Sequence, residues 1–286
     1  MTEYNSMWLM LAEQEFCQKW LDIDGVGTRV AIAGPEDAQP VILLHGTGGH
    51  WETFAPTIAA LSTTYRCVAI DMIGNGFTDK PDYDYEIEVY AAHVRGVMAT
   101  LSIEHAHFIG MSLGAWVSAR MAQHHPEAVD RLVLMSPAGL IATKGNMERI
   151  RAERTKAVQD PDWESIKALF VHLIADDERR LPDLIGLRQA IYRRPDTLAT
   201  IDHLLALQEE DKRERNLLSP EEWSQISAPT LVVASGKDHG EYQSTARQIA
   251  ALIPDAEVFE MPEVRHWPHF EDPELFNPAA LDFLGR

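Results

Sequence analysis

The sequence has little cysteine, little positive charge and no long apolar run, and each shortage narrows its possible functions. Its only two cysteines, Cys17 and Cys67, cannot form a disulfide framework, and each lies in an apolar, strand-like run where a buried free thiol is expected. With 25 Lys and Arg against 44 Asp and Glu, the formal net charge is −19, which disfavours nucleic acids and anionic membrane surfaces as partners. We therefore expect a small-molecule partner.

Membrane and export signals are also missing from the sequence. No apolar run approaches the length of a membrane span. The first 20 residues carry Glu3, Glu13 and Glu15 before the first Lys, so they lack the basic start of a signal peptide. These two observations lead us to expect a soluble cytoplasmic protein.

Two common cofactor motifs are absent as well. The sequence has neither H-E-x-x-H nor a Cys-His cluster, so we expect no catalytic metal. Its glycine-rich turn, His45-Gly46-Thr47-Gly48-Gly49, lacks the G-K-[ST] ending of a phosphate-binding loop. We therefore do not expect this turn to bind a phosphate group.

Short apolar runs alternate with helical patterns over most of the chain. The runs 41–44, 67–70, 107–109, 132–135 and 231–234 are typical of strands buried on both faces of a parallel sheet, and a further short strand is predicted at 257–261. The segments 51–61, 86–101, 112–125 and 242–252 have helical patterns. Alternating residues at 16–24 and 28–33 indicate an antiparallel hairpin at the start. The pattern predicts an α/β fold with a doubly wound, mostly parallel sheet and helices on both faces.

The alternation breaks between Gly139 and about Asn216, where no buried strand is predicted. Ten arginines fall in this segment, and most of them are expected on solvated helix faces. Prolines at 161, 182 and 195 mark helix starts, so we predict four short helices near 146–158, 162–175, 183–193 and 196–209. We interpret 140–216 as a helical lid inserted into a core formed by 1–139 and 217–286.

The pentapeptide Gly110-Met111-Ser112-Leu113-Gly114 lies between an apolar strand and a helical segment. A serine at such a tight turn needs a strained backbone, and glycines two residues away on either side allow strand and helix to approach. The turn presents Ser112 as a nucleophile.

A serine nucleophile needs a histidine base and an orienting carboxylate. Asp238 follows the buried run 231–234 and is predicted to be the acid, with capping of the next helix as its alternative role. His266, after the last predicted strand, is the predicted base. His269, nearer the start of a final helix, is its competitor and is expected to pack or cap.

The glycine-rich turn is predicted to form part of an oxyanion hole. The N–H of Thr47 and the N–H of Leu113, at the start of a helix, are the expected donors.

Together, His45-Gly46, the segment 71–76, Ser112, Asp238 and His266 resemble the α/β-hydrolase superfamily along nearly the full chain. The resemblance implies an eight-stranded, mostly parallel sheet with an inserted helical lid. The lid and the ending from His266 to Glu271 look like the meta-cleavage-product hydrolases, which cleave a C–C bond without a cofactor and carry a tryptophan after the catalytic histidine.

The same resemblance implies four substrate-binding residues, Met111, Trp267, Gly48 and Arg188. Because Met111 stands where those enzymes usually have asparagine, our first expectation is hydrolysis of a small hydrophobic or aromatic ester through an acyl-enzyme. C–C hydrolysis of 2-hydroxy-6-oxo-dienoates is the alternative, and a non-catalytic ligand receptor on the same fold is a third hypothesis. A homodimer or higher homo-oligomer stays open.

Overall fold

Eight strands form one sheet in the computed structural model, which describes residues 5–141, 143–238 and 240–286. Their order across the sheet is β1-β2-β4-β3-β5-β6-β7-β8. β1 and β2 are antiparallel to each other, β2 is antiparallel to β4, and all the other pairs are parallel. The strands are β1 (Phe16–Ile23), β2 (Val26–Ala33), β3 (Pro40–Leu44), β4 (Arg66–Ile70), β5 (Ala106–Met111), β6 (Val129–Met135), β7 (Thr230–Ser235) and β8 (Ala256–Met261). The predicted fold class is confirmed.

The central strands are buried on both faces, as their continuous apolar runs predicted. The expectation for the two cysteines is only half right. Cys67 in β4 is buried, which raises the pKa of its thiol to about 12, but Cys17 is exposed. The reason is that β1 is an edge strand whose residues are mostly exposed.

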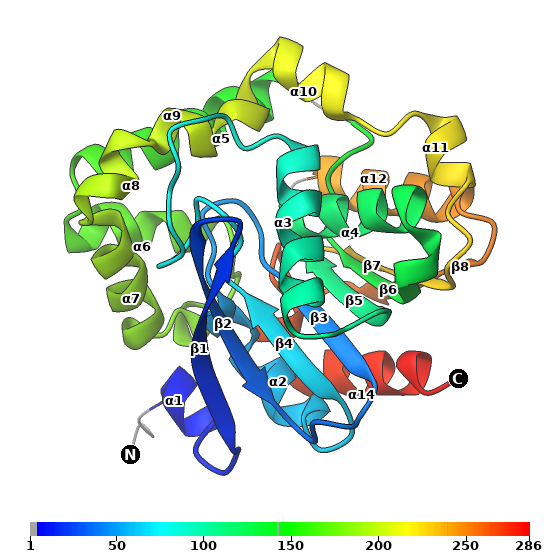
Figure 1. Cartoon of the computed structure of the whole chain (residues 1–286). Helices are drawn as coiled ribbons and strands as arrows, with labels where there is room; N and C mark the ends of the chain where they lie inside the picture. The colour runs from blue at the N-terminus through cyan, green and yellow to red at the C-terminus, as the bar shows by residue number, and fades with distance from the viewer. Residues whose placement is uncertain (1–4, 142, 239) are drawn as a thin grey trace.

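Helices cover both faces of the sheet (Figure 1). α3 and α4 pack together over one face, while α2 and α14 pack together over the other, and α12 covers β7 and β8. Outside the insert the helices are α1 (Met7–Met10), η1 (Trp51–Phe54), α2 (Ala55–Leu61), α3 (Ile87–Thr100), α4 (Leu113–His124), η2 (Pro126–Ala128), α12 (Gly240–Leu252), α13 (Pro268–Glu271) and α14 (Pro273–Leu284). Within the described ranges, no helix is long and apolar enough to cross a membrane.

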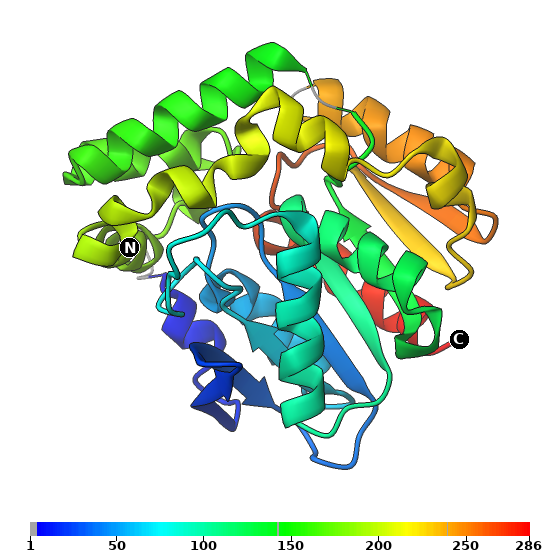
Figure 2. The same ribbon diagram turned by 45° about the horizontal axis from the view of Figure 1, so that its top comes forward.

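A helical insert, residues 144–224, separates β6 from β7. Figure 2 shows its green and yellow helices spread above the sheet. They are α5 (Lys144–Gln159), α6 (Trp163–Val171), η3 (Asp177–Arg179), α7 (Pro182–Tyr192), α8 (Pro195–Ala199), α9 (Ile201–Leu204), η4 (Ala206–Gln208), α10 (Glu210–Asn216) and α11 (Pro220–Ser224).

The predicted fourth helix of the insert, 196–209, is wrong as a single element, because α8, α9 and η4 divide it. The break follows Ala199, where both the N–H and the hydroxyl of Thr200 donate to the Asp196 carbonyl, at 3.1 and 2.8 Å, and hydroxyl bonds of this kind bend helices. The helix predicted at 162–175 also ends early, at Val171. The carbonyl of Leu173 instead accepts the N–H groups of His266 and Trp267, at 3.1 and 3.2 Å.

Candidate active site

Ser112 occupies the sharp turn between β5 and α4, with φ 54° and ψ −109°. The two flanking glycines are required by close backbone contacts. A Cβ on Gly110 would lie 2.4 Å from the carbonyl oxygen of Gly114, and a Cβ on Gly114 would lie 2.0 Å from that of Leu44. Ser112 therefore sits in a strained conformation of the kind that presents a nucleophile, at the carboxyl end of β5.

Asp238 and His266 are joined by a hydrogen bond of 2.8 Å between Oδ2 and Nδ1. Because a carboxylate only accepts, Nδ1 carries the proton and Nε2 keeps its lone pair for a hydroxyl. The N–H of Lys237 donates to the carbonyl of Val264 at 2.8 Å, which ties the loop of Asp238 to the loop of His266. Both residues line the same cavity as Ser112.

His269, the competing base, packs in the core away from this cavity. Its ring lies 4.7 Å from the ring of Phe54 and 6.1 Å from that of Phe276, and burial lowers its pKa to about 3. A histidine enclosed in this way has the packing role that the sequence suggested for it.

The glycine-rich turn lies beside Ser112. Gly48 donates its N–H to the side-chain oxygen of Asn75 at 2.8 Å, and Gly49 donates to the carbonyl of Gly46 at 2.9 Å. Within the described residues the N–H groups of Thr47 and Leu113, which starts α4, are left free for a ligand. These are the two donors predicted for an oxyanion.

A cavity lies around Ser112. Of the four residues predicted to bind substrate, Met111 and Trp267 line it, whereas Gly48 and Arg188 are not among its lining residues. The insert closes the other side through α5, α6 and the residues that follow α6, and the insert residues that line the cavity are Arg149, Ile150, Glu153, Arg154, Leu169, His172 and Leu173.

The insert also brings two arginines to one tyrosine hydroxyl. Arg154 Nη1 donates to Tyr192 Oη at 3.0 Å, and both atoms lie against the glycine turn, where a Cβ on Gly48 would be 2.8 Å from each. Arg188 is fully buried, 5.7 Å from the Tyr192 ring and 5.5 Å from the ring of Phe170. Burial would raise the pKa of Tyr192, but the charges of Arg154 and Arg188 lower it.

Arg188 is the predicted substrate-binding residue with the most unusual surroundings. Within the described part of the chain no carboxylate pairs with it, and its side-chain nitrogens make no hydrogen bond of normal geometry. Burial lowers its pKa, and the neighbouring Tyr192 hydroxyl acts in the opposite direction. Arg154 and Tyr192 were missed, because one arginine among ten in helical segments carries no distinguishing signal.

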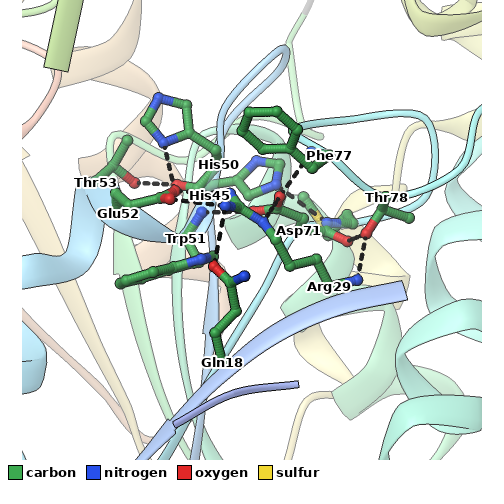
Figure 3. A network of polar contacts seen from close by, with 12 residues as sticks. Gln18, Arg29, His45, His50, Trp51, Glu52, Thr53, Asp71, Phe77 and Thr78 are labelled. Atoms are coloured by element: carbon green, nitrogen blue, oxygen red, sulfur yellow. Dashed lines mark hydrogen bonds and ion pairs between the residues drawn. The ribbon is translucent and has the colours of Figure 1, made fainter. Parts of the chain in front are cut away.

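A buried ionic network supports the segment after the glycine turn (Figure 3). Arg29 donates to both oxygens of Glu52 at 2.8 Å and, through Nε, to Asp71 at 2.7 Å. Asp71 also accepts the N–H of Trp51 at 2.7 Å. Burial alone would lower the pKa of Arg29, but the two carboxylates raise it, so the guanidinium stays charged. The sequence analysis did not find this network.

His45 connects the network to the turn. Its Nδ1 donates to the carbonyl of Gly46 at 2.7 Å, and its Nε2 accepts the N–H of Met72 at 3.1 Å. Burial lowers its pKa to about 4, which keeps the ring neutral and preserves both bonds.

In the ranges that the structure describes, no group of three His, Cys, Asp or Glu residues is arranged to hold a metal ion.

Comparison with known proteins places this geometry in a family. The profile of the α/β hydrolase fold matches residues 39–273. The chain is 28% identical to the 2-hydroxy-6-oxo-6-(2'-aminophenyl)hexa-2,4-dienoic acid hydrolase of Metapseudomonas resinovorans, over 96% of this chain and 93% of that protein. It is 30% identical to the 2-hydroxy-6-oxononadienedioate/2-hydroxy-6-oxononatrienedioate hydrolase of Comamonas testosteroni, over 90% of this chain and 92% of that protein. The structure of a meta-cleavage product hydrolase from Pseudomonas fluorescens IP01 superimposes with a TM-score of 0.81 at 27% identity, covering 93% of this chain and 97% of that one.

Proposed function

Since the chain belongs to the α/β-hydrolase fold family, we propose that it hydrolyses the C–C bond between carbons 5 and 6 of a 2-hydroxy-6-oxo-dienoate. Ser112 is the nucleophile, His266 the general base and Asp238 the carboxylate that orients it. Ester hydrolysis was the first expectation from the sequence and becomes the second candidate. The reason is that the two relatives described above, which align with 90% or more of this chain, are named as hydrolases of dienoates.

Arg188 is the observation that carries this choice of substrate. Taking a guanidinium out of water costs several kcal/mol unless an anion compensates for it, and no carboxylate of the described residues lies in contact with Arg188. The carboxylate of a dienoate would pair with Arg188 through two parallel hydrogen bonds. A neutral ester has no group that does so.

The reaction begins with a shift of the substrate from enol to ketone. The 2-hydroxyl loses its proton and carbon 5 gains one, so carbon 5 becomes a possible leaving carbanion. His266 then takes the proton of Ser112, whose oxygen attacks carbon 6, while the N–H groups of Thr47 and Leu113 bind the resulting oxyanion. Each hydrogen bond of this kind stabilises the transition state by about 3–4 kcal/mol.

Cleavage follows from this intermediate. The bond between carbons 5 and 6 breaks, its electron pair delocalises to the oxygen on carbon 2, and a proton restores the neutral enol. Water then attacks the acyl-serine. For a 6-phenyl substrate the balance is one water consumed, with benzoate and 2-hydroxypenta-2,4-dienoate released.

The test is a direct comparison of substrates. The purified protein is assayed with 2-hydroxy-6-oxo-6-phenylhexa-2,4-dienoate, by loss of its visible absorbance and by product analysis, and with p-nitrophenyl butyrate. We expect kcat/KM for the dienoate to be higher by about tenfold or more, a difference of about 1.4 kcal/mol. Ser112→Ala is the control and should abolish both activities while leaving folding intact.

Three other results would change the proposal. A preference for the ester would refute C–C hydrolysis and support the second candidate. Turnover of neither substrate, without labelling of Ser112 by a fluorophosphonate, would favour the ligand receptor. Residual activity of Ser112→Ala near the unchanged protein would refute Ser112 as nucleophile.

Ester hydrolysis is favoured by one feature, Met111. Its side chain lines the cavity beside Ser112 and packs on the glycine turn, with Sδ only 3.1 Å from where a Cβ on Gly46 would lie. A methionine fills space well but offers only a weak sulfur acceptor to a polar dienoate.

A further inference from the structure

His50 and Glu52 form a second buried pair of a histidine and a carboxylate, in the segment after the glycine turn. His50 Nδ1 lies 2.9 Å from Glu52 Oε2, and neither side chain is exposed to solvent. Figure 3 shows the His50 ring at the margin of the ionic network, with one nitrogen directed at Glu52.

The network determines which nitrogen of His50 carries the proton. Arg29 donates to each oxygen of Glu52 and thereby favours the ionised carboxylate, which can only accept hydrogen bonds. Nδ1 of His50 is therefore the donor, and Nε2 of the neutral ring has a free lone pair. His266 and Asp238 stand in the same relation.

Nε2 of His50 has no hydrogen-bond partner among the residues that the structure describes, and the guanidinium of Arg188, beside the Tyr192 hydroxyl, has none of normal geometry and no carboxylate. Both are fully buried. Tyr192 Oη would lie 2.8 Å from a Cβ on Gly48, two residues before His50, and Arg188 lies 5.7 Å from the Tyr192 ring, so both groups adjoin the glycine turn. Burial first, and then the charge of Arg188, lower the pKa of His50, so its ring stays neutral. A ligand that satisfies both must donate a hydrogen bond to His50 and accept hydrogen bonds from Arg188.

Neither His50 nor Arg188 lines the cavity itself, but each adjoins residues close to its wall. His50 follows Gly49, which lines the cavity. Arg188 lies over Phe170, whose ring is 5.7 Å from the ring of Trp267, another lining residue. A substrate head group would have to pass between Gly49 and Trp267 to reach both.

We propose that Nε2 of His50 accepts a hydrogen bond from the 2-hydroxyl of the substrate, next to the carboxylate that Arg188 binds. A 2-hydroxy enol acid carries a donor and an acceptor on adjacent carbons, which matches the two unsatisfied groups. This inference rests on the proposed function and makes His50 a specificity residue. It predicts selection of 2-hydroxy acids over acids that lack the hydroxyl, because the latter leave Nε2 buried without a donor.

The test measures binding in a Ser112→Ala background, where no turnover interferes. Calorimetry gives Kd for 2-hydroxypenta-2,4-dienoate, a proposed product, and for penta-2,4-dienoate, which lacks only the hydroxyl. We expect the hydroxyl to improve Kd by about tenfold, as for a buried hydrogen bond that replaces an unsatisfied acceptor.

Two variants at this position separate the two ring nitrogens. In His50→Asn the amide nitrogen takes the place of Nδ1 and keeps the bond to Glu52, but nothing reaches the position of Nε2. In His50→Gln the amide oxygen reaches that position as an acceptor. We expect His50→Asn to lose the hydroxyl preference and His50→Gln to retain part of it. His107→Asn, a buried histidine at the other end of β5, is the matched control and should keep the full preference.

The outcomes separate this inference from the proposed function. An unchanged preference in His50→Asn would overturn it, and so would an equal loss of affinity for both acids, which indicates only a structural role. Cleavage of the dienoate is measured independently in the protein with Ser112 intact. If cleavage failed while the hydroxyl preference depended on His50, the C–C hydrolase proposal would be wrong and the His50 site would stand.

Discussion

Replacing Arg188 with methionine should change stability and activity in opposite directions. Arg188 is fully buried without an anionic partner among the described residues, so it destabilises the protein as long as no ligand is bound. Methionine has a similar length and no charge. Because the variant removes a desolvated, unpaired cation from an apolar setting, the free energy of unfolding should rise by about 1–3 kcal/mol.

The same change should abolish most of the proposed activity. Loss of one partner from a buried, hydrogen-bonded ion pair costs about 3–5 kcal/mol, which corresponds to about 10²–10⁴ in kcat/KM for the dienoate. Turnover of p-nitrophenyl butyrate should change by less than about fivefold, because that ester has no carboxylate and incidental effects of a substitution are about 1 kcal/mol.

The assay combines urea denaturation of the free protein with kinetics on both substrates. Arg193→Met is the matched control, since Arg193 follows α7 directly and its side chain is exposed. This variant should leave the free energy of unfolding and kcat/KM for the dienoate unchanged. A variant that is less stable and still cleaves the dienoate normally would refute the reasoning, because Arg188 would then be a structural cation with a partner in the free protein.

Three further predictions address the triad, the cavity wall and the pH dependence of stability. Asp238→Asn should lower kcat by up to about 10⁴-fold with little effect on binding, and an unchanged kcat in steady-state assays would require another acid. Met111→Asn should raise the ratio of dienoate to ester turnover, since an unpaired buried amide costs about 1–3 kcal/mol against an apolar ester, and a fall in that ratio would contradict this. Burial lowers the pKa of His93 and His107 to about 4 and of His269 to about 3. As pH falls below about 6.5, the unfolded chain takes up these protons first, so the free energy of unfolding should fall by at most about 1.4 kcal/mol per pH unit for each histidine until its folded pKa is reached. Urea unfolding curves at pH 7, 6 and 5 that coincide would contradict this.

Local patterns were sufficient to predict the sheet and the elements that surround Ser112. Each buried strand is a short apolar run, and a turn with glycines at 110 and 114 allows few alternatives. Asp238 and His266 could be chosen because parallel strands bring their carboxyl ends to one edge of a sheet. The pairing of these two side chains at 2.8 Å agrees with that choice.

Contacts between distant segments could not be predicted in the same way. Arg29 meets Glu52 and Asp71, residues that are 23 and 42 positions further along the chain, and no periodicity links them. The position of Thr200 within an apparently continuous helical pattern was also uninformative, because its hydroxyl could equally well have pointed to solvent. Only the packing of the insert distinguishes Arg188 from the other arginines.

The insert also takes part in positioning the catalytic loop, so it cannot be treated as a detachable cover. The single carbonyl of Leu173 accepts the N–H groups of both His266 and Trp267, and Glu271 accepts the N–H of Ala175 at 2.6 Å. Buried backbone groups that lose their partners cost about 1–3 kcal/mol each. Any motion of the insert that opened the cavity near α6 would therefore have to break these bonds or carry His266 with it. Substrate entry is expected on the side of α5, where Arg149 and Glu153 line the cavity and are partly exposed.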